Sequence, residues 1–291
     1  MKKERLAILY TFITIILWGT VAAVSKLMLR DINNFQLMFY VSLFSTIILF
    51  TFVLFKGKLN KSIGLFKENK LHIILLGILG LGISQFFYFT ALSEAPATQV
   101  NVLNYLWPIF ILIFSIFILK EKFSWKILIS FLLGLIGAVI IITEGKFIVF
   151  NSNYLLGYFF ALCAAFSWGL FSVLSKKKKV DPLLSVFLFN LIGLIFMFLI
   201  MLFTKTSFNI SFNSLIGTLY IGVIPTGLAF LLWIKAIHIG KASTIANLAH
   251  LTPFVSLLFI FVILKEQISL NEIVGLVIIV SGVLLQNFKR R

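Results

Sequence analysis

Polar residues and a proline recur in one short apolar stretch at the helical spacing i, i+3, i+4, i+7: Asn101, Asn104, Tyr105 and Pro108. That spacing places them on one face of a helix, with Trp107 at its border. Pro108 cannot donate a hydrogen bond to the carbonyl of Asn104, so this carbonyl could accept from a substrate ammonium. The amides of Asn101 and Asn104 could in turn donate to a carboxylate. The face therefore predicts a site for a small zwitterion, or alternatively a set of hydrogen bonds that join helices.

The other candidate substrate-binding residues come from four further apolar stretches: Trp18, Gln85, Tyr88, Trp168, Asn247 and His250. Trp18 and Trp168 fall in the middle of their stretches, away from the interfacial belts that tryptophan favours in membranes. They could line a cavity for a flat or cationic substrate, or simply pack helices together. His250 could carry protons near neutral pH, and it could equally be a neutral, hydrogen-bonded histidine.

Acidic and metal-binding residues are scarce in the apolar stretches. No Asp or Glu falls centrally in any of them, and Cys163 is the only cysteine. An integral-membrane enzyme would need paired carboxylates, a metal cluster or a nucleophile with its base, so this alternative is disfavoured. We expect no metal, no cofactor and no catalytic residue. A substrate of zero net charge suits a polar site without a buried countercharge.

The composition predicts an integral membrane protein. Hydrophobic residues make up 61% of the 291 positions and charged residues only 12%, too few to cover a soluble fold. The net charge of +16 does not indicate a nucleic-acid partner, because the basic residues punctuate long apolar runs rather than cluster on one face. The expected surroundings are a lipid bilayer.

A spanning helix needs about 20 mostly apolar residues. By this measure the chain is all-α with ten transmembrane helices, expected near residues 6–29, 35–55, 71–92, 98–118, 125–143, 154–174, 183–203, 213–234, 243–263 and 271–288.

The chain also repeats itself. Trp18-Gly19 matches Trp168-Gly169 at an offset of 150 residues, and Leu119-Lys120-Glu121 matches Leu264-Lys265-Glu266 at an offset of 145. The repeat divides the chain into two five-helix halves, residues 1–146 and 147–291. Because five is odd, the second half must cross the membrane upside down relative to the first. Inverted halves around a site near the bilayer midplane are a recurrent transporter architecture.

The Trp-Gly start of each half, the prolines Pro108 and Pro253, and the two Leu-Lys-Glu ends resemble the EamA-type branch of the drug/metabolite transporter superfamily. The resemblance covers essentially the whole chain and implies a carrier of small metabolites by alternating access. The segment Asn104–Pro108 is similar to the fourth helix of bacterial aromatic amino acid exporters, as is Thr252-Pro253-Phe254, more weakly, in the ninth. It implies export or facilitated movement of amino acids; choline-like amines, nucleobases and vitamins are the alternatives. A homodimer is compatible with this architecture and is not required.

The basic residues predict the orientation. With both termini in the cytoplasm of a bacterial cell, all but five of the 25 Lys and Arg fall on the inner side of the inner membrane; the five are Lys26, Arg30, Lys146, Lys205 and Lys265. A reporter fused to the C-terminus should be active only if the reporter works in the cytoplasm. Activity of a reporter that functions only outside the membrane would contradict this topology.

Overall fold

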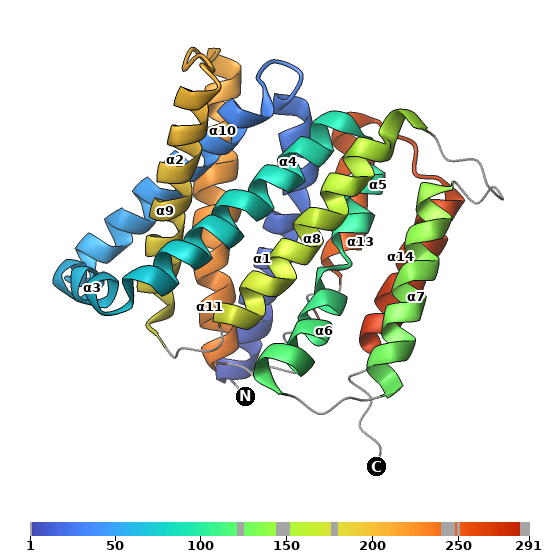
Figure 1. Ribbon diagram of the computed structural model, residues 1–291, viewed down its shortest axis with the longest axis horizontal. Helices are drawn as coiled ribbons and strands as arrows, with labels where there is room; N and C mark the ends of the chain where they lie inside the picture. Colours follow the sequence, from blue (N-terminus) through green and yellow to red (C-terminus); the bar gives the residue numbers. More distant parts are fainter. Residues whose placement is uncertain are drawn as a thin grey trace.

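The computed structural model describes residues 2–120, 125–143, 152–175, 180–239, 248 and 251–285, and within them the chain is helical without a strand. The first half contains α1 (Lys2–Met28), α2 (Asn34–Phe55), α3 (Leu59–Leu76), η1 (Gly77–Ile83), α4 (Ser84–Glu94), α5 (Ala97–Asn104), α6 (Trp107–Leu119) and α7 (Trp125–Ile142). The second contains η2 (Ser152–Tyr154), α8 (Leu155–Ser175), α9 (Pro182–Phe203), α10 (Phe212–Ile221), η3 (Gly222–Leu228), α11 (Ala229–Ile239), α13 (Thr252–Phe259), η4 (Ile260–Leu264) and α14 (Leu270–Leu284). Figure 1 shows them as one bundle, in which α1 begins and α14 ends at the lower end.

The fold is that of a multi-pass membrane protein. Among the described residues, seven helical segments are long and apolar enough to cross a bilayer: Lys3–Met28, Asn34–Phe55, Leu59–Glu94, Ala97–Leu119, Leu155–Ser175, Pro182–Phe203 and Phe212–Trp233. Three shorter apolar helices cover Phe131–Ile141, Thr252–Leu264 and Leu270–Gly282. Each predicted span overlaps one of these ten segments, although three of the segments are shorter than a full span.

Unusual backbone features recur at the offset that the sequence repeat predicts. Both η1 and η3 are π-helices of seven residues, and they begin 145 residues apart. The backbones of Lys120 and Lys265 are also 145 residues apart and both are left-handed, with φ of 57° and 56°. A lysine seldom adopts this conformation, so the shared Leu-Lys-Glu string marks a shared way of ending a helix.

Close packing joins the two halves through α2 and α9. The hydroxyl of Ser45 on α2 donates to the side-chain oxygen of Asn190 on α9 at 3.0 Å, and these residues are again 145 apart. A Cβ at Gly77 of η1 would lie 2.6 Å from Ile192 of α9, and one at Gly222 of η3 would lie 2.7 Å from the carbonyl of Val41 on α2. Glycine at these points lets each π-helix lie directly against the opposite half.

Helices α7 and α14 form a pair at one edge of the bundle, side by side in Figure 1. Two glycines make their crossing tight. A Cβ at Gly137 would lie 2.7 Å from the carbonyl oxygen of Gly275, and a Cβ at Gly275 would lie 2.9 Å from that of Gly137. Because the obstacle on each side is backbone, an added methyl group can be accommodated only if the helices move apart.

Gly137→Ala should therefore destabilise the protein by about 1–3 kcal/mol, the usual cost of overpacking. The measurement is thermal unfolding in detergent. Gly64→Ala is the matched control, because a Cβ there meets nothing within 4 Å. Equal melting temperatures for the two variants would show that the α7–α14 contact is not tight.

Candidate functional site

The predicted fourth span is broken in its middle. α5 ends at Asn104, a turn covers Tyr105 and Leu106, and α6 begins at Trp107. The amide of Leu106 bonds to the carbonyl of Leu103, one residue closer than in an α-helix. Pro108 accounts for the break, since it has no N–H and its ring crowds the preceding turn. The single straight face expected for Asn101 to Pro108 is thus divided between two short helices.

The two asparagines of α5 are only partly satisfied. The side-chain oxygen of Asn101 accepts a hydrogen bond from the hydroxyl of Ser256 on α13 at 3.1 Å. Its amide nitrogen is buried and has no partner, and the side chain of Asn104 makes no hydrogen bond to another described residue. Buried polar groups are nearly always paired, so an unpaired amide donor needs an explanation. Asn101 therefore joins two helices, and its buried amide donor is unused in the described structure.

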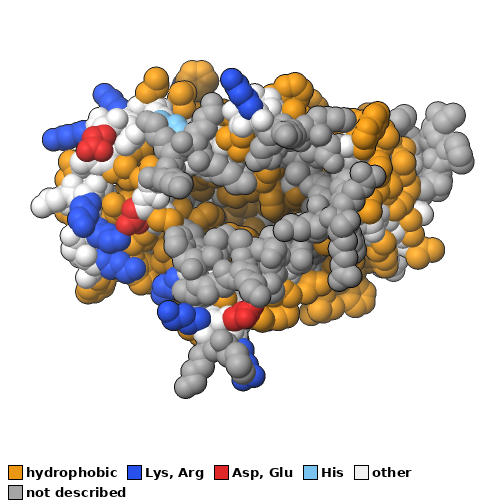
Figure 2. Space-filling view, turned by 90° about the horizontal axis from the view of Figure 1, so that it is seen from below, with side chains coloured by type: hydrophobic (Ala, Val, Ile, Leu, Met, Phe, Trp, Pro, Cys, Tyr) orange, Lys and Arg blue, Asp and Glu red, His pale blue; other side chains and the backbone are white. Residues whose placement is uncertain are grey.

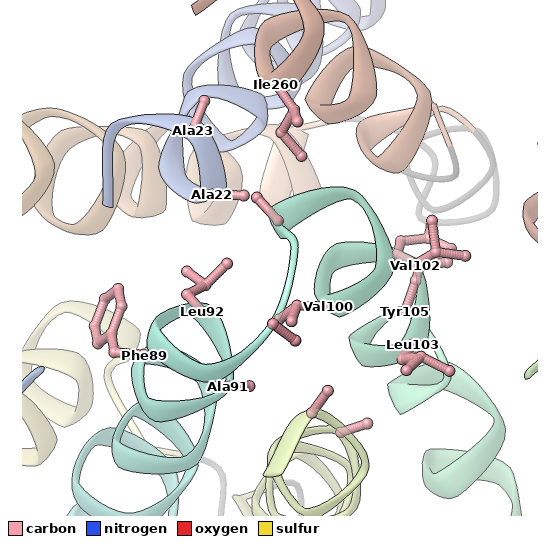
Figure 3. Close-up of a cluster of buried hydrophobic side chains, with 14 of the residues drawn as sticks. Ala22, Ala23, Phe89, Ala91, Leu92, Val100, Val102, Leu103, Tyr105 and Ile260 are labelled. Atoms are coloured by element: carbon pink, nitrogen blue, oxygen red, sulfur yellow. The ribbon is translucent and has the colours of Figure 1, made fainter. Parts of the chain in front are cut away.

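Tyr105 belongs to the apolar cluster that forms where α1, α4 and α5 meet (Figure 3). Tyr105 is 7% exposed, and its ring lies 6.0 Å from that of Trp107 in an edge-on arrangement. Tyr88 packs against the cluster from α4. Neither Tyr88 nor Gln85, one turn earlier on α4, hydrogen-bonds to another described residue. The structure thus gathers Tyr88, Tyr105 and Trp107 around one core.

The two midspan tryptophans have different surroundings. The indole N–H of Trp18 donates to the carbonyl of Pro225 in η3 at 3.0 Å, and its ring lies 5.3 Å from that of Trp233. Trp168 packs 5.1 Å from Phe171, in a second apolar cluster, and its indole N–H has no polar partner in the described structure. Trp18 therefore ties α1 to the second half, and only Trp168 retains an unused donor.

A cavity of about 270 Å³ lies at the lower end of the bundle, among α3, α8, α9 and α11. Figure 2 looks onto this end, where apolar side chains are visible in a central recess. The cavity lining includes Asn69, His72, Phe171, Ser185, Phe230 and Trp233. None of the eight described candidates lines this cavity, but Trp18 contacts Phe230 and Trp233, and Trp168 contacts Phe171.

Part of this lining could have been found from the sequence. Phe230 and Trp233 lie 145 residues after Gln85 and Tyr88, so applying the repeat offset to that predicted pair leads directly to them. His72 was not among the predicted site residues. A break in α3 at Asn69 (φ −127°, ψ 27°) precedes it, and both residues line the cavity. No sequence pattern predicts the break at Asn69.

At the upper end, a lysine caps the turn between α4 and α5. The ammonium group of Lys26 on α1 donates to the carbonyls of Leu92 and Ala95 at 2.5 and 2.8 Å. Leu92 lies in the last turn of α4 and Ala95 directly follows that helix, so the helix itself offers no further N–H to these carbonyls. A cation is favoured at this end of a helix dipole. Lys26, which the predicted topology places on the outer side, is thus engaged within the bundle.

A carboxylate caps the other side of the same turn. Glu266, two residues after the end of η4, accepts from the amides of Ala97 and Thr98 at the start of α5, at 3.3 and 3.2 Å. The hydroxyl of Thr98 donates to the 4%-exposed Glu272 of α14 at 2.7 Å. In the sequence, Glu266 is notable only as part of the repeated Leu-Lys-Glu string, and Glu272 was not among the predicted site residues. Lys26 and Glu266 together bind the α4–α5 turn to α1 and η4; we call these two residues the upper clasp.

At the lower end, an ion pair joins the two halves. The ammonium group of Lys58, before α3, lies 2.5 Å from the carboxylate of Asp181, which also caps α9. Burial alone would raise the pKa of Asp181, but the hydrogen bonds from Lys58 and from the amides of Leu183 and Leu184 outweigh it and hold the pKa below its ordinary value.

Two candidates lie outside the described residues. Asn247 and His250 fall in the stretch before α13. Their roles stay predictions.

The known proteins that this chain resembles are named as transporters. A protein from Clostridium kluyveri named an uncharacterized transporter is 29% identical and covers 97% of this chain and 92% of its own length. An aromatic amino acid exporter, YddG, from Ancylobacter novellus is 30% identical over 64% of this chain and 65% of its own. An S-adenosylmethionine uptake transporter from Rickettsia prowazekii is 26% identical over 89% of this chain and 85% of its own length.

A solved structure at 24% identity covers 97% of this chain and 96% of its own length with a TM-score of 0.70, which shows a common fold. The profile of the EamA-like transporter family matches twice in succession, over residues 5–143 and 155–288. Together these two stretches take in nearly every element described above. This protein belongs to the EamA-like transporter family.

Proposed function

We propose that this transporter works by alternating access, with residues 1–146 and 147–291 as two inverted five-helix halves that cross the membrane ten times. The recurrence of π-helices, left-handed lysines and helix ends at one offset supports this architecture. The different surroundings of the equivalent Trp18 and Trp168 support two halves held in different conformations. Exchanging those conformations would open one end of the bundle and close the other.

The observation that carries the proposal is the contrast between the two ends. The upper end is tied together by the clasp of Lys26 and Glu266, while the lower end, where the Lys58–Asp181 pair joins the halves at the rim, contains the 270 Å³ cavity. We assign the lower end to the cytoplasm, because most of the basic residues belong there, and place the chain in the bacterial inner membrane. The conformation described is then the one that faces inward.

For the substrate we propose a neutral amino acid or a similar zwitterion. The amide nitrogen of Asn101 offers a donor for a carboxylate, and the Asn104 carbonyl, which Pro108 cannot occupy, offers an acceptor for an ammonium group. The aromatic lining of the cavity suits an apolar side chain. The same aromatic groups would favour flat or cationic compounds, so amines and nucleobase derivatives form the second class to be tested.

Asn104→Ala keeps the backbone carbonyl but removes the side-chain amide that we expect to donate to the substrate carboxylate. It should reduce amino acid uptake into proteoliposomes by about tenfold or more, because the loss of a hydrogen bond in a buried site costs about 1–3 kcal/mol. Trp107→Ala should act in the same direction. Asn60→Ala, at an exposed position, is the control and should transport normally. The substrate for the assay is the compound, among amino acids, amines and nucleobases, that raises the melting temperature of the wild type. If both α5–α6 variants unfold early and show no selective loss of transport, the face is structural.

Glu266→Ala should favour the opposite conformation by removing the clasp. The assay labels a cysteine in the lower cavity, Ser185→Cys, in a Cys163→Ala background. Because a hydrogen bond to a charged group contributes about 1.5–3 kcal/mol, labelling from the lower end should slow by about fivefold or more. Lys205→Gln, which removes an exposed charge from the upper end, should leave the rate unchanged. Unchanged labelling in Glu266→Ala would mean that the clasp does not hold the upper end shut.

A further inference from the structure

The apolar helical segment Leu59–Glu94 is too long for the membrane that it crosses. Its 36 residues extend roughly 50 Å at 1.5 Å per residue, whereas the hydrocarbon core of a bilayer is about 30 Å thick. The helix is broken at Asn69, ten residues from its start, where the backbone leaves the helical region. The stretch Leu59–Glu68 can therefore lie outside the hydrocarbon core. We call it the lower-end helix.

The lower-end helix has three distinct sides. Ser62 is 2% exposed and faces the protein. Leu59 and Ile63, one turn apart, are large apolar residues left 37% and 46% exposed. The charged side chains of Lys61, Lys67 and Glu68 are exposed on the remaining side. A helix with one packed, one apolar and one charged side fits the boundary between lipid tails and water.

The charge on this helix and its ends is strongly positive. Lys56, Lys61, Lys67 and Lys70 are exposed, against the single acidic residue Glu68. Lys58 is already paired with Asp181. In Figure 2, Lys and Arg side chains gather on the side of the lower face where α3 lies. Four exposed lysines around an apolar strip complement a surface that carries negative charge above a hydrocarbon interior.

We propose that the lower-end helix binds the headgroups of anionic phospholipids, with Leu59 and Ile63 inserted between the acyl chains and the four lysines on the lipid phosphates. The partner is a lipid surface rather than a soluble acidic protein, because the exposed apolar residues adjoin the basic ones on one short helix. The proposal needs only that the chain sits in a membrane, and it is independent of the substrate.

The lipid contact would act on the cavity. Leu65 and Asn69 line the cavity at the lower end, and they lie on the packed side of the helix and at its break. The Lys58–Asp181 pair attaches the start of the same helix to α9 of the other half. Binding of this helix to lipid therefore fixes the position of one wall of the cavity. The negative charge of the membrane surface would then influence how readily the lower end opens.

The test places a fluorescent label on Ile63→Cys in the Cys163→Ala background, reconstituted in nanodiscs of phosphatidylcholine alone or with an equal amount of phosphatidylglycerol. Quenching of the label by acrylamide, a neutral water-soluble quencher, should fall by about twofold or more in the anionic discs, since each lysine adds to the attraction. The effect should fade at 1 M salt, where charges are screened beyond about 3 Å.

The variant Lys61→Gln/Lys67→Gln/Lys70→Gln should lose the dependence on phosphatidylglycerol. Its matched control, Arg30→Gln/Lys205→Gln/Lys265→Gln, removes three exposed charges at the opposite end and should retain it. Equal quenching in the two kinds of disc would overturn the proposal, and so would an undiminished response in the first triple variant. A response that appears only when an acidic soluble protein is added would assign the helix to that partner instead.

Discussion

Inside a lipid bilayer a backbone N–H or C=O needs a partner within the protein, and at several described points where a helix ends or widens a side chain supplies one. The turn between α4 and α5 ends one helix and begins another. Its carbonyls accept hydrogen bonds from the ammonium group of Lys26, and its amides donate to the carboxylate of Glu266. The indole of Trp18 does the same for the carbonyl of Pro225 in a π-helix. The few polar side chains that the chain places within the bundle are thus largely engaged by its own backbone.

Against that background, the polar groups without a partner stand out. The amide nitrogen of Asn101 and the side chains of Gln85 and Asn104 lie on α4 and α5, within the first half. The equivalents of Gln85 and Tyr88 in the second half are Phe230 and Trp233, which are aromatic and line the cavity. The two halves share a backbone plan but differ in chemistry. A substrate with a polar head and an apolar side chain could be oriented by that difference, its head toward the first half.

The sequence predicted the helices well because long apolar runs and their basic flanks are direct consequences of the bilayer. It also predicted Trp18 and Asn101 as polar or aromatic groups within the bundle. It could not predict their partners, since Pro225 and Ser256 are each more than 150 residues away in the chain. The break at Tyr105 was implicit in Pro108, whereas the one at Asn69 depends on packing. Glu272 looked like an ordinary helix-end residue, and only the approach of α5 buries it.

The matching π-helices also bear on how this protein arose. A π turn holds one more residue than an α turn, so such a segment can record a single-residue insertion into an older helix. η1 and η3 begin 145 residues apart, and the family profile matches the chain twice. Two separate insertions at equivalent positions are a less economical history than one. We infer that the extra residue was present before the repeat arose, so that one duplication carried the wide turn into both stretches that the family profile matches.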